Sequence, residues 1–312
     1  MYSTDRVSPL KPKALDPSMD DGPGPKPNPA ASQAARERCI GEIIREANSL
    51  TAEQVDQVLA HQRQHGMRFG EAAVALDLIK TSDVLWALSQ QFHYPYTPEA
   101  RAQLHDELVV ANRPFSEQAE VFRSIRSRLT MQLHSGQDVR RAIAVVSPDH
   151  GDGKTFFAAN LAIAYSQLGG RTLLIDADLR SPRQHELFGV DNTTGLSGVL
   201  SGRVVNQVVH SVADLPSLYV LPVGTPPPNP LELLERPAFN LLMTDLMGKF
   251  DHVVVDTPAA LAGADASVIA ARCGAALAIA RRGRSRMGAL QDLVQLLQGT
   301  PARLVGALLN DF

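Results

Sequence analysis

From residue 141 onward, short aliphatic runs alternate with stretches that have helical periodicity. Both faces of a parallel sheet are buried by crossover helices, so its strands are apolar throughout and do not alternate with polar residues. This pattern predicts an α/β domain with a mostly parallel, doubly wound sheet, covered by helices on both faces. The runs that we assign as strands are 141–147, 171–178, 218–224, 252–258, 275–282 and 303–310.

The N-terminal third has a different organisation. Residues 1–35 are rich in proline and have little to bury, which predicts a disordered arm. Residues 36–97 contain an internal repeat, because a shift of 29 residues aligns Gly41 with Gly70. Each copy has the pattern of a short helix, a turn and a longer amphipathic helix, which predicts a small all-helical domain. Thr51 and Ser82 lie where the second helix of each copy should be capped.

Residues 98–113 have the composition of a linker, and 114–312 form the predicted α/β domain. This domain opens with a predicted helix from Ser116, on which Phe122, Ile125 and Leu129 share one face.

The composition and charge argue against nucleic-acid binding, a structural disulfide and a membrane-spanning segment. The net charge of −3 and the isoelectric point near 6.3 provide no general attraction to nucleic acid, so no nucleic-acid partner is expected. The two cysteines, Cys39 and Cys273, are far apart in the sequence, which argues against a structural disulfide and favours a cytoplasmic protein. No stretch reaches the ~18 consecutive apolar residues needed to span a bilayer. Any membrane role is therefore expected to come through a partner.

The stretch SPDHGDGKT, residues 147–155, lies between the first predicted strand and a predicted helix. It resembles the phosphate-binding loop G-x-x-x-x-G-K-[ST], with Pro148 at the first glycine position. Glycines let the loop backbone approach a phosphate, the lysine reaches the β- and γ-phosphates, and Thr155 offers a hydroxyl to Mg²⁺. The alternative is a glycine turn with an exposed lysine. The residues expected to contact ATP are Gly151, Asp152, Gly153, Lys154, Thr155 and Phe156.

Three acidic residues end two other predicted strands. Asp176 and Asp178 close the run LLIDAD, and Asp256 closes HVVVD. The carboxyl ends of parallel strands face the ligand crevice of an open sheet, so these carboxylates suit a Mg²⁺ site and a proton acceptor. An aspartate after a strand can also be only a helix cap. Arg180 follows the first pair and has two open roles, phosphate binding or an internal salt bridge.

Taken together, these motifs resemble the bacterial tyrosine kinase family, which has a P-loop ATPase fold. The loop beginning Ser-Pro, the run LLIDADLR and the run VVVDTP all match, and the resemblance covers 114–312. It is closest to the EpsG-like chain-length-determinant kinases of exopolysaccharide gene clusters.

The resemblance implies a role for each matching residue. Asp178 would accept the tyrosine hydroxyl proton, with Lys154 and Asp176 as further catalytic residues. Thr155, Asp176 and Asp256 would lie on the Mg²⁺ side. The E-x-x-R-x-x-R helix, with Glu120, Arg123 and Arg126, would make contacts in a homo-oligomeric ring.

Family members without a membrane segment usually need a membrane chain-length protein, a polysaccharide co-polymerase, as activator. The resemblance therefore predicts an ATP- and Mg²⁺-dependent protein-tyrosine kinase or autokinase that regulates exopolysaccharide polymerisation, chain length or export.

The tyrosines do not match the family pattern. Family members usually end in a tyrosine-rich tail, whereas none of the five tyrosines here follows Tyr219. Either another protein is the substrate, or ATP binding acts as a switch.

Two other functions stay open. One is a positioning ATPase of the ParA or MinD kind, and the other is an inactive scaffold of the polysaccharide machinery. Positioning ATPases carry a lysine where this chain has Asp149, which argues against them. The run RRGRSR, 281–286, could bind DNA in such a protein, but a solvated loop is the favoured interpretation.

The repeat resembles the N-terminal domain of type II secretion and type IV pilus ATPases. Some of those domains bind cyclic di-GMP through paired motifs that begin Arg-Leu-Gly. The second copy here keeps Arg68 and Gly70, but the first copy has Cys39 where the arginine should be. Cysteine cannot replace arginine at an anionic ligand. Cyclic di-GMP binding is therefore possible on a degenerate motif, and a docking module is the favoured interpretation.

Overall fold

The computed structural model describes most of the predicted helical and α/β domains. The predicted arm, 1–35, lies outside the described residues. The described residues are 40–80, 83–84, 86–87, 104–134, 141–203, 207–213 and 215–311.

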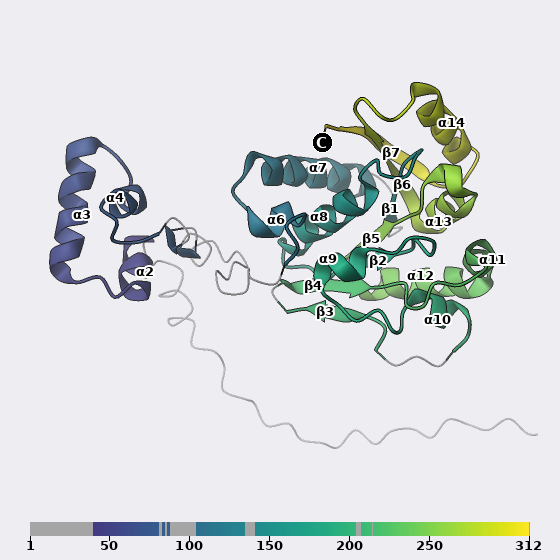
Figure 1. Cartoon of the computed structure of the whole chain (residues 1–312), viewed down its shortest axis with the longest axis horizontal. Helices are drawn as coiled ribbons and strands as arrows, with labels where there is room; N and C mark the ends of the chain where they lie inside the picture. The colour runs from purple at the N-terminus through teal and green to yellow at the C-terminus, as the bar shows by residue number, and fades with distance from the viewer. Residues whose placement is uncertain are drawn as a thin grey trace, which may run out of the picture.

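A seven-stranded sheet forms the centre of the α/β domain, in the order β3-β4-β2-β5-β1-β6-β7 (Figure 1). Every neighbouring pair is parallel except β3 and β4, which are antiparallel. This arrangement confirms the predicted α/β class with a mostly parallel sheet. The strands are β1 (Ala142–Val146), β2 (Thr172–Asp176), β3 (His210–Val212), β4 (Leu215–Leu221), β5 (His252–Asp256), β6 (Gly274–Arg281) and β7 (Arg303–Asn310).

Helices cover both faces of the sheet (Figure 1). On one face lie α6 (Val109–Asn112), α7 (Glu117–His134), α8 (Lys154–Ser166) and α9 (Gln184–Phe188). On the other lie α10 (Leu196–Leu200), α11 (Pro230–Glu235), α12 (Pro237–Lys249), α13 (Asp265–Cys273) and α14 (Met287–Gln298), with a short 3₁₀ turn, η2, at Ala260–Ala262.

The central strand β1 contributes to both hydrophobic layers. Ile143 and Val145 pack into the layer beneath α8, whereas Ala142 and Ala144 pack into the layer beneath α13. Burial on both faces explains why the strands are continuous apolar runs.

The segment that precedes α7 differs from its predicted role as a linker. Residues 106–112 form a turn and the short helix α6, and Leu108 and Val110 are fully buried in the core. The side chain of Asn160 on α8 fixes this segment, because it accepts from Val110 N at 2.9 Å and donates to Glu107 O at 2.8 Å. The second half of the predicted linker, 98–113, therefore packs as part of the α/β domain.

The helical unit contains α2 (Ile40–Ala47), α3 (Ala52–His65) and α4 (Phe69–Ala75), around a core that includes Ile44 and Val58. Thr51 caps α3 with a full capping box, as predicted. Ser82 lies outside the described residues. In the second copy Lys80 N donates to Asp83 Oδ2, and this bond is equivalent to the one from Thr51 N to Gln54 Oε1 in the first copy.

Among the described residues, none of the helices is both long and apolar enough to cross a membrane.

Candidate active site

The loop between β1 and α8 is shaped by two glycines and by its own lysine. Gly151 and Gly153 have φ values of +83° and +97°, in the left-handed region that favours glycine. Lys154 turns back over the loop, where its Nζ donates to Ser147 Oγ at 2.9 Å and to Asp149 O at 3.3 Å. The serine of the Ser-Pro start therefore anchors the lysine.

Carboxylates surround the buried Lys154 ammonium. Burial lowers its pKa, while Asp256 and then Asp178 act in the opposite direction. The lysine is 5% exposed, so its charge is held in a site with little water. A buried ammonium in such surroundings is a strong partner for phosphate oxygens.

Groups from the ends of β6 and β7 hold the loop from the other side. Arg281 Nη1 donates to Gly151 O at 3.1 Å, and Ser285 Oγ donates to Asp152 Oδ1 at 2.7 Å. Asn310 Nδ2 donates to Asp152 O at 3.0 Å. The carboxylate of Asp152 also accepts from Asp149 N at 2.9 Å, so this side chain is fully buried within the loop. The structure therefore shows the Asp152 carboxylate shaping the loop, and its contact with the nucleotide stays a prediction.

The run 281–286 is only partly a solvated loop. Its exposed residues include Arg282 and Arg286, but Arg281 and Ser285 pack on the phosphate loop. Sequence reasoning did not identify these two residues or Asn310 as part of the site.

Asp176 and Asp256 end neighbouring strands and are paired in register. Both carboxylates are buried, and burial raises the pKa of each, that of Asp256 to about 6. Asp176 accepts from the backbone amides of Asp178, Arg183 and Gln184, at 3.2, 3.0 and 2.9 Å. These bonds give Asp176 a clear part in shaping the loop after β2.

Gln184 connects the elements of the site and was missed by sequence reasoning. Its side chain is fully buried, and Nε2 donates to Asp256 Oδ2 at 2.8 Å and to Thr155 O at 3.1 Å. Its backbone amide holds Asp176. A glutamine at the start of a short helix has no motif, so no sequence signal marks it.

Asp178 differs from the other two carboxylates because it reaches the cavity. Its Oδ1 accepts from Ser181 N at 2.9 Å and from Arg180 N at 3.2 Å. The Arg180 side chain forms a salt bridge with Asp265 at 3.0 Å, which agrees with the internal role considered for it.

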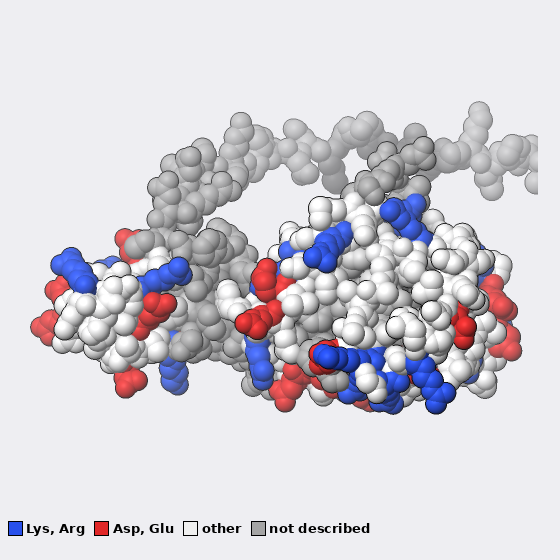
Figure 2. Space-filling model, turned by 90° about the horizontal axis from the view of Figure 1, so that it is seen from above, with Lys and Arg blue, Asp and Glu red and all other residues white. Residues whose placement is uncertain are grey.

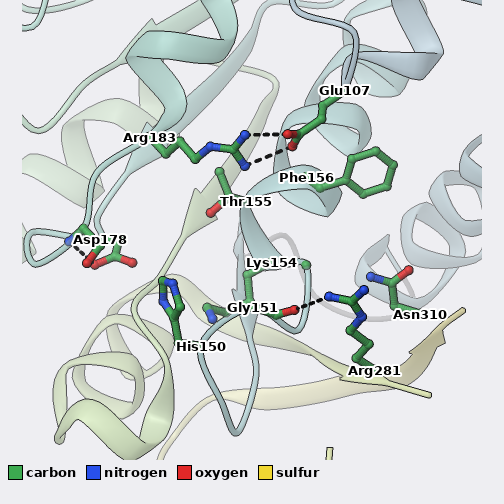
Figure 3. A pocket seen from close by; sticks show the side chains of 12 residues that line it. Glu107, His150, Gly151, Lys154, Thr155, Phe156, Asp178, Arg183, Arg281 and Asn310 are labelled. Carbon is green, nitrogen blue, oxygen red and sulfur yellow. Dashed lines mark hydrogen bonds and ion pairs between the residues drawn. The ribbon is translucent and has the colours of Figure 1, made fainter. Parts of the chain in front are cut away.

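A cavity of about 470 Å³ lies above the phosphate loop (Figure 3). Five of the six residues predicted to contact the nucleotide line it, together with Asp178; Asp152, Asp176 and Asp256 do not. Figure 3 shows Glu107 and Arg183 at one end and Arg281 and Asn310 at the other. The lining residues are Glu107, His150, Gly151, Gly153, Lys154, Thr155, Phe156, Asp178, Ser181, Arg183, Arg281 and Asn310.

The residues present fit a Mg²⁺ ion that is shared with nucleotide phosphates. In the described residues no cluster of three or more His, Cys, Asp or Glu side chains has metal-binding geometry. A phosphate-bound Mg²⁺ needs few protein ligands, because phosphates and waters supply the rest. The Thr155 hydroxyl favours the charged form of Asp256, and Asp256 Oδ1 is buried without a hydrogen-bond partner among the described groups. Thr155 and Asp256 are therefore suitable ligands.

The three residues predicted to make subunit contacts are engaged within the chain. Arg123 Nη1 pairs with Glu120 at 2.7 Å, and Arg126 Nη1 donates to Ala164 O on α8 at 2.6 Å. The exposed positions of α7 include Val121 and Met131, which are 56% and 66% exposed.

The two residues predicted for cyclic di-GMP lie in the helical unit. Arg68 is exposed at the start of α4, and Gly70 is buried against Val84. A Cβ at Gly70 would lie 2.7 Å from Val84 Cγ1, so packing alone requires this glycine.

Comparisons with known proteins agree with this site. Residues 143–312, more than half of the chain, match the CobQ/CobB/MinD/ParA nucleotide-binding domain family. The chain is 30% identical over 209 residues to the tyrosine-protein kinase YwqD of Bacillus subtilis, covering 67% of this chain and 87% of that protein.

The chain is also similar to a longer relative and to a solved structure. The chain is 37% identical over 205 residues to EpsB of Ralstonia solanacearum, covering 65% of this chain but only 27% of that protein. The solved kinase domain of the Escherichia coli tyrosine kinase ETK is 32% identical, with a TM-score of 0.62, and the match covers 67% of this chain and 80% of that domain.

Proposed function

The chain belongs to the bacterial tyrosine kinases within the CobQ/CobB/MinD/ParA nucleotide-binding family, and we propose from this premise that it transfers the γ-phosphoryl group of ATP to tyrosine. The observation that carries the proposal is that Lys154 and Asp178, from two different loops, line one cavity. A lysine for the phosphates and a carboxylate for the acceptor hydroxyl are the two groups that phosphoryl transfer to an alcohol requires.

Each group of the loop has a defined part in this reaction. The backbone amides of the phosphate loop and the amino end of α8 bind the β-phosphate, and Lys154 binds β- and γ-oxygens. Asp178 orients the tyrosine hydroxyl and accepts its proton, while the amides of Ser181 and Arg180 hold its Oδ1 in place. A bound Mg²⁺ would neutralise charge on the phosphates.

The acceptor tyrosine comes from outside the described core. Tyr165 is 2% exposed and stacks on His252 at 4.4 Å, and burial raises the pKa of its hydroxyl. Tyr219 is half-buried against Phe250. Neither lines the cavity. We therefore place the acceptor on another protein or on Tyr2, Tyr94 or Tyr96, which lie outside the described residues.

The test incubates the purified full chain with Mg-ATP, with and without a cytoplasmic fragment of a membrane chain-length protein. Phosphotyrosine and free phosphate are both measured. We expect phosphotyrosine on one of the proteins, lost in Lys154→Ala and in Asp178→Asn. Phosphate release without phosphotyrosine would refute the kinase and favour an ATPase switch. Absence of ATP binding that depends on Lys154 would refute the nucleotide site itself.

We further propose that the kinase regulates exopolysaccharide chain length or export, as an oligomer recruited by a membrane co-polymerase. The motifs shared with kinases of exopolysaccharide clusters support this part. Cells that carry Lys154→Ala in place of the normal protein should make polysaccharide of altered length. Unchanged length and amount would contradict the role.

For the helical unit we propose a docking role. The packing requirement of Gly70 supports this assignment, because it explains the glycine without a ligand. Calorimetry with cyclic di-GMP at about 100 µM tests it, since a nucleotide site of useful affinity would give heat at that concentration. A measurable heat that Arg68→Ala abolishes would replace docking with nucleotide sensing.

A further inference from the structure

An ion pair closes one end of the cavity and has no part in the mechanism described above. Arg183, from the loop after β2, pairs with Glu107, from the segment before α7 (Figure 3). The contact is bidentate: Nη1 donates to Oε2 at 3.0 Å, and Nη2 donates to Oε1. A guanidinium fits a carboxylate and a phosphate with the same fork of donors, so the two anions can compete for it.

The backbones of both residues are fixed. Glu107 O accepts from the buried Asn160 side chain, and Arg183 N donates to Asp176 Oδ2 at 3.0 Å. The two side chains are 33% and 42% exposed, so they can change rotamer while the main chain stays in place. A change of partner by Arg183 therefore needs only side-chain movement.

The position of the pair is suited to the terminal phosphate. Arg183 and Glu107 line the cavity with Lys154, Thr155 and Asp178, and Figure 3 shows Arg183 beside Thr155. Asp178 and Arg183 come from the same loop, at the end of the cavity away from Asn310. The ion pair adds no net charge at this end of the cavity, and a released Arg183 guanidinium would face the γ-phosphate of a bound triphosphate.

We propose that Arg183 binds the γ-phosphate of ATP, and that Glu107 holds the guanidinium until a triphosphate enters. This inference rests on the proposed ATP site. It makes Arg183 a catalytic residue that contacts the substrate, and it makes Glu107 a competitor for that residue. The site then distinguishes ATP from ADP through one side chain, and a structural salt bridge would not have this property.

The test measures dissociation constants for ADP and for a non-hydrolysable ATP analogue, both with Mg²⁺, in variants of the full chain. Glu107→Gln releases Arg183, so we expect the preference for the triphosphate to increase about two- to fivefold, the value of a half-exposed ion pair. Arg183→Gln should reduce the same preference about tenfold, the value of one charge-assisted contact. Arg183→Lys should restore part of it, because lysine keeps the charge without the fork.

The matched control is Lys249 with Asp245 on α12, an exposed ion pair of the same charge type at 2.7 Å. This helix leads into the amino end of β5, whereas the cavity lies at the carboxyl ends of the strands. Asp245→Asn and Lys249→Gln should leave the preference unchanged.

Shifts of opposite sign in Glu107→Gln and Arg183→Gln support the proposal. Equal shifts for ATP analogue and ADP, or shifts of the same sign in both variants, would overturn it. This test does not depend on phosphotyrosine. If the preference for the ATP analogue over ADP depends on Glu107 and Arg183 but no kinase activity is found, the proposed reaction is refuted and this inference stands. Lys154→Ala reports whether nucleotide binds at all.

Discussion

Two glycines at equivalent positions of the helical repeat should respond to alanine in opposite directions. Gly41 lies in α2 and Gly70 in α4. A Cβ at Gly41 would lie 3.7 Å from the nearest atom of Phe69, an ordinary contact. A Cβ at Gly70 would lie 2.7 Å from Val84 Cγ1, closer than packed atoms allow.

The magnitudes follow from helix propensity and from overpacking. Alanine in place of glycine stabilises a helix interior by about 0.5–1 kcal/mol. Gly41 is the second residue of α2, so Gly41→Ala should raise the free energy of unfolding by up to that amount. Gly70→Ala gains the same stabilisation from helix propensity but forces the β-branched Val84 aside. Such overpacking costs about 1–3 kcal/mol. We therefore expect Gly70→Ala to destabilise the unit by about 1 kcal/mol. The two variants should differ by about 2 kcal/mol.

The chain offers a specific signal for this measurement. Its one tryptophan, Trp86, packs against the core of the helical unit. Urea unfolding followed by tryptophan fluorescence therefore reports on this unit within the full chain. The double variant Gly70→Ala/Val84→Ala removes both crowded methyl groups of Val84, so it should lose less stability than the two single changes summed. A Gly70→Ala variant as stable as Gly41→Ala would refute the packing argument and return Gly70 to consideration as a ligand-binding glycine.

Three further predictions concern the α/β domain. Gln184→Met should lower the stability of this domain by about 1.5–3 kcal/mol, the value of a hydrogen bond to a charged group, because Asp256 loses the hydrogen bond from Gln184 Nε2. In differential scanning calorimetry this loss should shrink with Mg-ATP, and an equal loss in both conditions would separate Gln184 from the site. Tyr165→Phe should leave phosphotyrosine unchanged, since the side chain is buried, and a lost signal on immunoblots would contradict this. In a Cys39→Ser background, Cys273 should react with Ellman's reagent only after unfolding, because it is 1% exposed and burial raises the pKa of its thiol. Reaction of Cys273 in the native state would contradict this and show that α13 opens.

Local chemistry explains what could be predicted. The strand runs are apolar because both faces of the sheet are buried, and this pattern identified the six parallel strands. Gly153 and Lys154 mark the phosphate loop because a tight turn around an anion restricts the residue types. The Thr51 cap could also be identified, since its partner Gln54 is three residues away.

Predictions were weaker where a role depended on the fold. The sequence did not indicate that the Asp152 carboxylate accepts from Ser285 Oγ and from Asp149 N and so shapes the loop. The start of the α/β domain was placed too late, because Leu108 and Val110 stand in a polar stretch and their burial depends on α8.

The sequence by itself determined the class of fold, the loop that binds phosphate and the presence of carboxylates at the strand ends. These depend on residues within about ten positions of one another. Only the tertiary structure decided which carboxylate reaches the cavity, that Gln184 joins Asp256 to Thr155, and that Glu107 holds Arg183. Those contacts join residues 29 to 76 positions apart. Which residues meet in these contacts depends on the strand order, in which β1 lies between β5 and β6. The pattern of apolar and polar residues along the sequence does not encode that order.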